Sequence, residues 1–534
     1  MLLERKKYYF KISAKFLIYF FLIYFFHSCL SGPAVNLSPS YKTPNYVVPD
    51  SWEGSGPFVK ANPSEGVLRP DWWKLYNDPI LNQLQEELVV ANPDLQAAAE
   101  RFVQARDMML KMRSRLIPNI GVGFGASNNK QSENALFRGP LDPTTGASIT
   151  GAGLVSWEPD FWSSIRNATR SQMYQAQERA AEYALAKLSL QAELATDYFV
   201  LRGLQAKKAT YEKSIDYYKQ SLELVIYRYK GGISPELDVY RSKYMLASTQ
   251  AQLYDIDSQI QVMEHAIAIL VNKAPTNFRI EPVGEFKIVE FQIPTQVPTK
   301  LLERRPDIAA MERRMAQANQ EIGIAKAAFF PNISLGANLG NENNSFNLSK
   351  LANSFWSYGS SVSMPVFQGG YRRAQLQQAW SAYRETEDVY RSTVLNAFRE
   401  VENALTQTKL LYLEAERQDV AVDSALQTQK MTVQLYTGGL SNSLELLFAQ
   451  LSTLDASISA ISVKTELLKS TVALVKSLGG GWDKTQLPSD DKIQPLDIFQ
   501  MKDFETPKPI EGYPVHSDDN SKFNDLTKPA QPQK

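Results

Sequence analysis

Two stretches of the chain carry an uninterrupted helical pattern of apolar and polar positions. Tyr371 to Thr437 contains 67 residues without Gly or Pro, and Ser163 to Lys230 contains 68 with only Gly203 to weaken the helix. At a rise of 1.5 Å per residue, each helix is expected to be about 100 Å long. We therefore predict two helices far longer than those of an ordinary compact domain.

A second helix is predicted after each long one, because a glycine pair allows the chain to reverse at Gly231-Gly232 and at Gly438-Gly439. The two following segments without Gly or Pro are Glu236 to Ala274 and Leu440 to Leu478. In the last segment, mostly apolar residues recur every seven positions on two interleaved lines that begin at Leu444 and Leu447. This heptad pattern predicts a coiled coil with Leu444 on its seam.

Short segments of alternating polarity lie between the helices. Asn119 to Ala126, Asn332 to Leu339 and the residues around Trp356 place apolar side chains on one face and small or polar side chains on the other. A barrel with lipid outside and water inside has this pattern, and so does a half-buried sheet of a soluble protein. Four strands cannot enclose an aqueous lumen, so strands that lie in a membrane would require several chains to share one barrel.

The order of these elements occurs twice, which predicts an internal duplication. Each half is expected to run helix, strand pair, very long helix, turn and helix. The matching landmarks are Asn92-Pro93-Asp94-Leu95 with Arg305-Pro306-Asp307-Ile308, Pro118-Asn119-Ile120 with Pro331-Asn332-Ile333, Trp157-Glu158-Pro159-Asp160-Phe161 with Ser363-Met364-Pro365-Val366-Phe367, and Tyr229-Lys230-Gly231-Gly232 with Tyr436-Thr437-Gly438-Gly439.

The pattern divides the chain into six parts. They are a signal peptide (1–28), a Pro-rich strap (29–70), a first repeat (71–275, with a strand pair near 119–160 and a helical hairpin at 163–274), a linker (276–300), a second repeat (301–482, with a strand pair near 332–367 and a helical hairpin at 371–478), and a C-terminal tail (483–534). The frequent prolines of the strap favour an extended chain. The Pro-, Asp- and Lys-rich tail is expected to be mostly disordered.

The N-terminal residues are interpreted as a secretory signal. A basic start precedes the apolar run Phe16 to Phe26, which is too short to span a bilayer as a helix. The run leads to Ser28-Cys29, which resembles a bacterial lipoprotein signal whose Cys29 becomes the lipidated first residue, although Phe26 and His27 are unusual at that site. The alternative is an ordinary signal with an incidental Cys. The later sequence offers no candidate transmembrane helix, so we expect any membrane crossing to be made by strands.

Composition excludes several classes of function. The 534 residues include 57 basic and 57 acidic side chains, one Cys and three His. One Cys rules out a disulfide framework or a thiolate zinc cluster, and the balanced charge argues against a nucleic-acid partner. Because no ATP-binding loop, nucleophile motif or metal-ligand cluster is present, we expect no enzymatic activity, no metal site and no cofactor.

Several motifs, in order, resemble those of the TolC-like outer-membrane efflux factors. They are Arg304-Arg305-Pro306-Asp307-Ile308, Ile322-Gly323-Ile324-Ala325-Lys326-Ala327-Ala328-Phe329-Phe330-Pro331, Met364-Pro365-Val366-Phe367-Gln368-Gly369-Gly370 and Leu478-Gly479-Gly480-Gly481-Trp482. The resemblance covers about residues 68–482 and is greatest to the lipoprotein branch, of the OprM/NodT type, that serves resistance-nodulation-division (RND) pumps.

This resemblance implies a mixed α and β fold. The chain would form a homotrimer whose twelve-stranded transmembrane β-barrel, with four strands per chain, lies in the outer membrane and continues into a long α-helical tunnel in the periplasm. An inner-membrane RND-type pump and a periplasmic adaptor would dock at the far end of the tunnel, and the pump would supply the energy.

In the resembled family the tunnel narrows at the helical hairpins, which here are Tyr229 to Val239 and Tyr436 to Phe448. Glu445 and Phe448 lie on one flank of the second hairpin, beside Leu444. Three copies of Glu445 would form an acidic ring that favours cations, and Phe448 would form an aromatic constriction. The alternative is that Glu445 is a solvated surface carboxylate and Phe448 an interhelical contact.

Asp238 and Tyr436 match family positions that are linked to holding neighbouring hairpins closed. Because a tyrosine hydroxyl and a carboxylate can share a charge-assisted hydrogen bond, removing either group should loosen the closed state.

Two further clusters have a structural interpretation. Met108, Met109, Met112, Met311 and Met315 are a possible soft-metal relay for copper or silver, but methionine is a common filler of helix interfaces, which is the interpretation we favour. Arg304-Arg305 precedes Pro306 and is interpreted as a helix-start and packing motif rather than an anion site.

The leading hypothesis is therefore a passive, gated duct for drugs or other small toxic molecules, anchored by lipid in the outer membrane and extending into the periplasm. An exit duct of a type I protein secretion system uses the same fold and is the first alternative. A coiled-coil structural protein of the envelope is the second, and it would not need alternating strands. The sequence does not disclose the transported substrate or the identity of the pump and adaptor.

Overall fold

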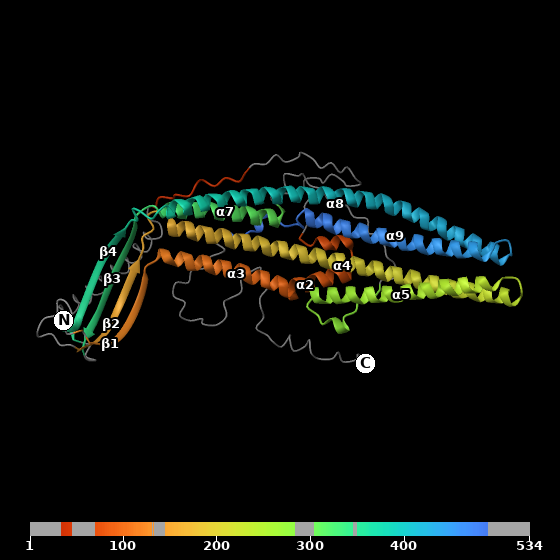
Figure 1. Cartoon of the computed structure of the whole chain (residues 1–534), viewed down its shortest axis with the longest axis horizontal. Coiled ribbons are helices and arrows are strands. Elements are labelled where there is room, and N and C mark those ends of the chain that lie inside the picture. Colours follow the sequence, from red (N-terminus) through yellow and green to blue (C-terminus); the bar gives the residue numbers. More distant parts are fainter. Residues whose placement is uncertain are drawn as a thin grey trace, which may run out of the picture.

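The computed structural model describes residues 34–44, 70–130, 132, 145–282, 304–344 and 350–489. The signal peptide and Cys29 lie outside the described residues, as do most of the linker and the tail from residue 490 onward. The molecule is a long rod with a four-stranded sheet at one end and helices along the rest (Figure 1).

The elements of the first half are η1 (Trp72–Tyr76), α2 (Pro79–Ala91), α3 (Pro93–Arg113), η2 (Ser114–Leu116), β1 (Asn119–Lys130), β2 (Thr145–Trp157), α4 (Ser164–Lys230), α5 (Glu236–Leu270) and η3 (Pro275–Asn277). Those of the second half are α7 (Pro306–Ala327), β3 (Asn332–Asn343), η4 (Leu351–Asn353), β4 (Ser354–Ser363), α8 (Tyr371–Thr437), α9 (Ser443–Ser477) and η5 (Lys484–Gln486). The order helix, strand, strand, long helix, helix thus occurs in both halves.

The helices form one row of neighbours at each level of the rod. Next to the sheet the order is α3, α4, α7 and α8, and toward the other end it is α5, α4, α9 and α8. The two 67-residue helices α4 and α8 therefore run through both rows. As a result, α3 and α5 form one edge of the molecule, and α8 forms the other.

Gly203, the glycine inside α4, allows α4 and α9 to pack closely. A Cβ at this position would lie 2.2 Å from Oγ1 and 3.2 Å from Cβ of Thr465 in α9. The missing side chain weakens the isolated helix by about 1 kcal/mol relative to alanine, but it lets the two backbones approach each other. Gly203, which in the sequence only weakens a predicted helix, is therefore required for the packing of α4 against α9.

The sheet has the order β1-β2-β3-β4, and every pair is antiparallel. Its register confirms the predicted alternation. Val122 lies opposite Gly153, Gly153 opposite Leu339, and Leu339 opposite Trp356, so these residues share one face. The apolar residues of this face are Ile120, Val122, Phe124, Ile149, Val155, Trp157, Ile333, Leu335, Leu339, Trp356, Tyr358 and Val362. Glycine, serine, threonine and asparagine dominate the opposite face.

The largest buried cluster lies midway along the rod. It includes Trp72 and Tyr76 of η1, of which Tyr76 packs on Phe199 of α4, together with residues of α2, α5, α7, α8 and α9. This cluster fastens the two rows of helices to each other, because it is where α3 gives way to α5 along α4 and α7 gives way to α9 along α8.

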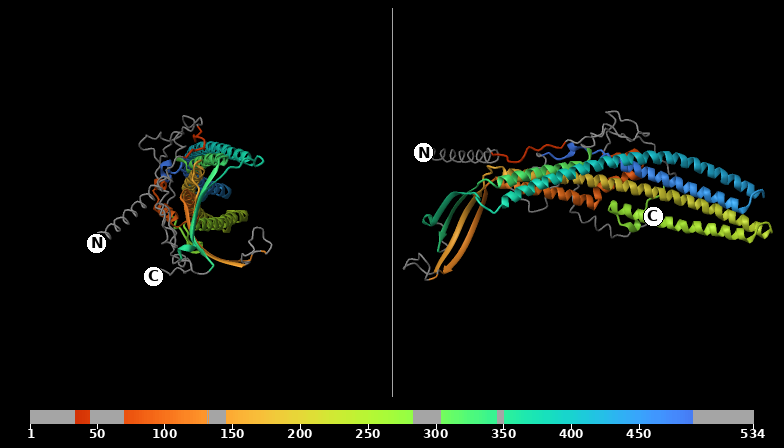
Figure 2. Two further views of the ribbon diagram at one scale, coloured as in Figure 1. Left: turned by 90° about the vertical axis from the view of Figure 1, so that its left-hand side faces the viewer. Right: turned by 45° about the horizontal axis from the view of Figure 1, so that its top comes forward.

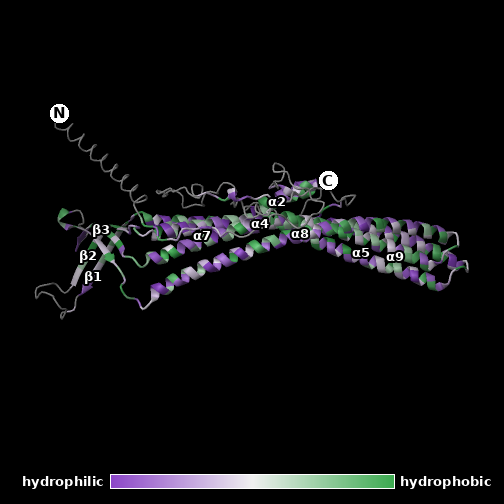
Figure 3. Ribbon diagram, turned by 90° about the horizontal axis from the view of Figure 1, so that it is seen from above, coloured by the Kyte–Doolittle hydropathy of each residue, from purple (hydrophilic) through white to green (hydrophobic). Residues whose placement is uncertain are grey.

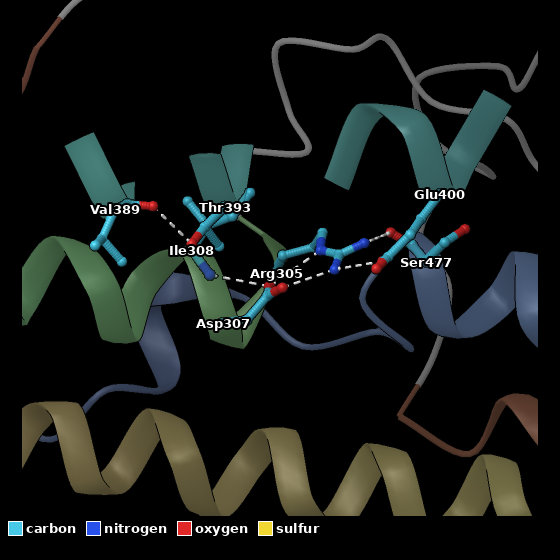
Figure 4. Close-up of polar contacts among 7 residues, drawn as sticks. All are labelled: Arg305, Asp307, Ile308, Val389, Thr393, Glu400 and Ser477. Carbon is cyan, nitrogen blue, oxygen red and sulfur yellow. Dashed lines mark hydrogen bonds and ion pairs between the residues drawn. The ribbon is translucent and has the colours of Figure 1, made fainter. Parts of the chain in front are cut away.

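Arg305 joins three helices at the same level (Figure 4). The buried guanidinium donates to Asp307 in the first turn of α7, to Glu400 of α8 at 2.7 Å and to the carbonyl of Ser477 at the end of α9 at 3.0 Å. Because these contacts are all with the protein itself, Arg305 acts as a packing residue, in agreement with the interpretation of the Arg-Pro-Asp motif.

Both ends of the described chain run along α7. Residues 34–44 have no regular secondary structure, and the hydroxyl of Tyr41 donates to Oε1 of the buried Glu312 at 2.9 Å. From the other end of the chain, Lys484 forms an ion pair with Glu312 at 3.6 Å. Glu312 therefore links the N-terminal strap and the C-terminal segment to one helix.

The apolar character of helix α9 differs from one expectation of the sequence analysis. By length and composition it is apolar enough to cross a membrane, whereas the sequence was expected to offer no such helix after the signal. Within this structure 44% of its apolar window is buried, and the helix packs against α8 and α4. Its apolar character is explained by the two neighbouring helices that it faces.

Candidate functional site at the helical tips

The two interhelical turns lie at the same end of the rod, far from the sheet (Figure 2, right). Gly232 and Gly439 adopt positive φ angles of 72° and 78°. The amide of Ile233 donates to the carbonyl of Arg228, and the amide of Leu440 donates to that of Leu435. Glycine is needed at both turns because side chains are strained in this left-handed conformation.

Tyr436 is the best-buried aromatic residue at the tips, with 2% of its surface exposed. It packs with Val225 of α4, Val239 of α5 and Leu446 of α9. One residue from each of the four helices therefore meets in this cluster, which joins the α4–α5 hairpin to the α8–α9 hairpin.

Arg228 holds Tyr436 in two ways. Its guanidinium lies 4.5 Å from the centre of the Tyr436 ring, and its Nη1 donates to the Tyr436 carbonyl at 2.7 Å. A desolvated cation–π contact is worth about 2 kcal/mol. The sequence analysis missed Arg228, and no local pattern could have found it, since the contact joins the ends of two helices that are 208 residues apart.

Asp238 lies one residue from the same cluster, in the first turn of α5. Its side chain is buried, and its Oδ1 forms an ion pair with Arg241 at 3.6 Å. Within the described part of the chain the hydroxyl of Tyr436 is buried and has no hydrogen-bond partner. The expected bond between Asp238 and Tyr436 is therefore not among the contacts of this structure, although Val239 brings the two residues close together.

Glu445 has a role in capping α9. Oδ1 of Asn442 accepts a hydrogen bond from the Glu445 amide at 2.9 Å, and the hydroxyl of Ser441 donates to the Glu445 carboxylate. Asn442 is therefore the N-cap and Glu445 the third residue of α9. The Glu445 carboxylate accepts from the side chains of Ser441 and Asn442, not from the N-cap amide as in a capping box. The carboxylate is exposed to solvent at the very end of the hairpin.

The seam of the coiled coil at the tip differs from the prediction. Leu446 is buried with 3% exposed, whereas Leu444, which was expected on the seam, is 43% exposed. Farther along α9 the heptad positions Thr465 and Val472 are buried as predicted. The reason is that the tip of α9 turns Leu446 toward the Tyr436 cluster, which leaves Leu444 partly exposed.

Phe448 is 60% exposed and is not buried by an interhelical contact within the chain. Leu444, Glu445 and Phe448 therefore all present surface outside the chain's own packing, as a constriction between copies would require.

The methionine cluster is divided between core and surface. Met109 and Met315 are buried, Met311 packs against the central cluster, and Met108 is 46% exposed. Two of the thioethers are thus fillers of helix interfaces. In the described part of the chain no group of three or more His, Cys, Asp or Glu residues is placed to hold a metal ion.

Comparison with known proteins identifies the family. The profile of the family described as "Outer membrane efflux protein" matches residues 84–273 and 297–480, which together are most of the chain. The chain is a member of the outer membrane efflux protein family. The two matched segments correspond to the two halves described above.

Individual relatives agree with this membership. The pyoverdine export outer membrane protein OpmQ of Pseudomonas putida is 28% identical over 474 residues, covering 85% of this chain and 97% of the relative. The outer membrane protein OprJ of Pseudomonas aeruginosa is 28% identical over 459 residues, covering 84% and 94%.

Solved structures share the fold. The outer-membrane channel OprN superposes with a TM-score of 0.77 at 27% identity, covering 83% of this chain and 99% of that chain. The outer membrane protein VceC of Vibrio cholerae has a TM-score of 0.72 at 27% identity, covering 78% and 99%. The mixed arrangement of four strands and long helices is therefore that of outer-membrane channels.

Proposed function

We propose that this outer-membrane efflux protein is a passive, gated channel through which a tripartite system exports small molecules, driven by an inner-membrane pump. The observation that carries the proposal is the apolar face that runs across all four strands, since it combines residues from both halves of the sequence in one register. A lipid-facing barrel wall requires such a face, with small and polar residues toward the water.

The two open edges of the molecule support a ring of copies. β1 and β4 are the outer strands of the sheet, and they continue into α3 and α8, which are the outer helices of the row. Joining β4 of one copy to β1 of the next keeps every strand pair antiparallel. Three copies would close a twelve-stranded barrel, and such closure removes unpaired strand edges.

The helices far from the sheet have exposed apolar surfaces that match one another. Exposed apolar side chains follow the free side of α5 at Leu237, Tyr240, Tyr244 and Tyr254, and those of α8 include Leu410, Leu413 and Val420. Apolar positions alternate with polar ones along the visible surface of α5 and α9 (Figure 3). Packing α5 of one copy against α8 of the next would cover both stripes and form a helical tunnel below the barrel.

In this trimer the tips are the gate. Leu444, Glu445 and Phe448 would line the constriction, with the Glu445 carboxylates as a ring that favours cations. Asp238 and Tyr436, together with Arg228, would hold the two hairpins of each chain in the closed arrangement. The shared cluster around Tyr436 supports this role, because opening the tip would separate its residues.

Cys29 is proposed as the site of lipid attachment. The amide of Val35 donates to the carbonyl of Phe161, at the junction of sheet and helices, at 2.9 Å. Six residues of extended chain reach about 20 Å, so a lipidated Cys29 would reach the membrane surface from this tether. Replacing Cys29 with Ser should abolish incorporation of labelled palmitate and leave the fold intact.

A periplasmic adaptor and an RND-type pump are the proposed partners, and the two similar halves are proposed to derive from an internal duplication. The similar protein OpmQ is named for export of pyoverdine, and another, the outer membrane protein TtgF of Pseudomonas putida, is named for efflux of toluene; both compounds are small molecules. This naming favours small-molecule efflux over an exit duct for secreted proteins. The sheet register supports a channel over a purely coiled-coil structural protein.

Ion selectivity in planar bilayers tests the gate. Glu445→Gln removes the charge but keeps a side-chain oxygen that can accept from the Ser441 hydroxyl, and Asn442 still caps the helix through the amide of residue 445. We expect the ratio of cation to anion permeability to fall several-fold in this variant, while the thermal stability stays that of the wild type. If E445Q has the same ion selectivity as the wild type, Glu445 does not line the constriction.

Gene deletion tests the pathway. Cells that lack the protein should accumulate a fluorescent efflux substrate and secrete their proteins normally. The opposite result, with normal efflux and a secretion defect, would favour the type I secretion alternative.

A further inference from the structure

The helix ends that adjoin the sheet carry an excess of positive charge. Within residues 111–118, 158–170, 321–331 and 364–373 there are eight basic side chains and three acidic ones. We call the eight basic residues the basic collar, and they are Lys111, Arg113, Arg115, Arg166, Arg170, Lys326, Arg372 and Arg373. They belong to α3, η2, α4, α7 and α8, whose ends meet where the strands begin (Figure 1).

Helix dipoles do not explain the collar. Basic residues suit the C-terminal ends of α3 and α7, but α4 and α8 begin at this level, and helix N-termini favour acidic residues. The first turns of α4 and α8 contain no acidic residue, and α8 instead begins with Arg372 and Arg373. From Val362 to Arg384 the sequence has three arginines and no carboxylate. At the start of α8 the described part of the chain thus supplies no acidic residue in the first turn to balance these arginines.

The protein compensates only part of this charge. The Asp160 carboxylate accepts hydrogen bonds from the first amides of α4 and forms an ion pair with Arg166. The Glu321 carboxylate accepts a hydrogen bond from Ser171. Arg372 donates to the uncharged Gln368, and neither Arg372 nor Arg373 forms an ion pair with any residue that the structure describes. Nη1 of Arg113 is buried without a hydrogen-bond partner among the same residues.

An exposed apolar segment lies beside the collar. Val366 and Phe367, in the turn from β4 to α8, are 94% and 88% exposed, and Met364 and Tyr371 are exposed as well. Trp162 stacks on Phe330 at the neighbouring junctions, with ring centres 4.6 Å apart. Apolar and aromatic residues next to basic ones are typical of the level where a bilayer meets water.

We propose that the basic collar binds the phosphate headgroups of anionic phospholipids in the membrane leaflet that faces the helices, while the segment Met364 to Tyr371 enters the acyl region. The proposal rests on the transmembrane position of the sheet. Charge complementarity with the collar and continuity with the apolar face of the strands both favour an anionic phospholipid as the ligand. The collar thereby fixes how deep the rod sits in the membrane.

Lipid binding by the purified, full-length protein tests the collar. The triple variant K111Q/R115Q/R373Q removes three exposed collar charges and is compared with K213Q/R417Q/K430Q, which removes three exposed charges from the lower parts of α4 and α8. Bound phosphatidylglycerol and phosphatidylcholine are counted by native mass spectrometry at equal lipid concentrations. Channel conductance in planar bilayers is recorded for all three proteins.

We expect the wild type and the control variant to prefer phosphatidylglycerol over phosphatidylcholine by about tenfold, and the collar variant to lose most of this preference. A collar variant that keeps the full preference overturns the proposal. Inorganic phosphate that displaces the bound lipid at equal concentration also overturns it, because the site would then be one for small anions. A collar variant with altered ion selectivity and unchanged lipid preference overturns the proposal as well, because the collar would then line the lumen.

The two proposals fail in different ways. Loss of lipid preference alone, with wild-type conductance in all variants, supports the collar and leaves the channel intact. An absence of conductance in the wild type refutes the channel, whatever the lipid result.

Discussion

At the scale of single residues, the tip contacts show how a charged side chain can hold two hairpins together. Arg228 belongs to α4, and its guanidinium lies over the ring of Tyr436 in α8 and donates a hydrogen bond to the Tyr436 carbonyl. The ring is buried, so this contact is protected from competition by water. It is a stronger candidate for holding the tip closed than the tyrosine hydroxyl, which has no partner in the described part of the chain.

Replacing Arg228 with Gln should raise the open probability of the channel several-fold, because it removes the cation–π contact and the fork of donors. Tyr436→Phe keeps the ring and should stay closed, unlike Tyr436→Ala. Single-channel recording compares these variants, with Lys230→Gln as the control for loss of a nearby basic charge. If Y436F opens the pore as far as Y436A, the hydroxyl and its predicted bond to Asp238 dominate instead.

Asp197 of α4 adds a pH dependence of stability. Burial, with a contribution from Glu193, raises the pKa of its carboxyl to about 6. Since this pKa is above the unfolded value, Asp197 destabilises the folded protein only when ionised. Its stabilising, protonated form is fully present below about pH 4, the unfolded pKa, and is lost as the pH rises through about 6.

Asp197→Asn should therefore raise the thermal unfolding midpoint at pH 7.5 and leave it nearly unchanged at pH 4. Differential scanning calorimetry of both proteins across this range gives the difference directly. A difference that is constant with pH would show that Asp197 has an ordinary pKa in the folded protein.

At the scale of elements, the helices were the most predictable part of the fold. The two long stretches, one without Gly or Pro and one with only Gly203, and the glycine pairs after them place α4 and α8 to within a residue or two. The strands were also predictable, because period-two alternation has only one register that collects the apolar side chains on one face. The heptad seam of α9 was correct in its C-terminal half and wrong at Leu444.

The close approach of α4 and α9 at Gly203 leads to a prediction for element packing. Gly203→Ala gains about 1 kcal/mol of helix propensity, but its methyl group would overlap Thr465, and rotation of the threonine cannot move its Cβ away. Overpacking of this kind costs about 1–3 kcal/mol. We expect a lower thermal midpoint for G203A and partial rescue in G203A/T465A. A more stable G203A would mean that the helices can move apart freely.

At the scale of the whole molecule, the rod has one continuous edge through β1, α3 and α5 and another through β4 and α8. Among the described residues of one chain both edges are open, and most of the apolar strand face is exposed. Viewed along the rod, the strands form a curved sheet rather than a closed barrel (Figure 2, left). The proposed membrane and neighbouring copies would cover these surfaces.

The two faces of β1 can be tested with adjacent residues. Val122→Arg places a charge on the proposed lipid face and should cost about 2–4 kcal/mol near the middle of the bilayer. Gly123→Arg places the same charge on the opposite face, where a Cβ would meet no atom within 4 Å. We expect V122R to abolish heat-modifiable trimers in outer-membrane fractions and G123R to retain them. Equal loss in both variants would contradict the assignment of faces.

The sequence by itself determined the local structure of this protein: which segments are long helices, where they reverse and which side of each strand is apolar. These properties depend on neighbouring residues and on fixed periods of the backbone, so they can be recognised along a single chain. Only the tertiary structure decided the contacts between distant segments, such as Arg228 on Tyr436, Arg305 between three helices and Thr465 against Gly203. Such contacts depend on how the helices are rotated and offset against one another, and small changes in that packing move a residue such as Leu444 from a buried seam to the surface.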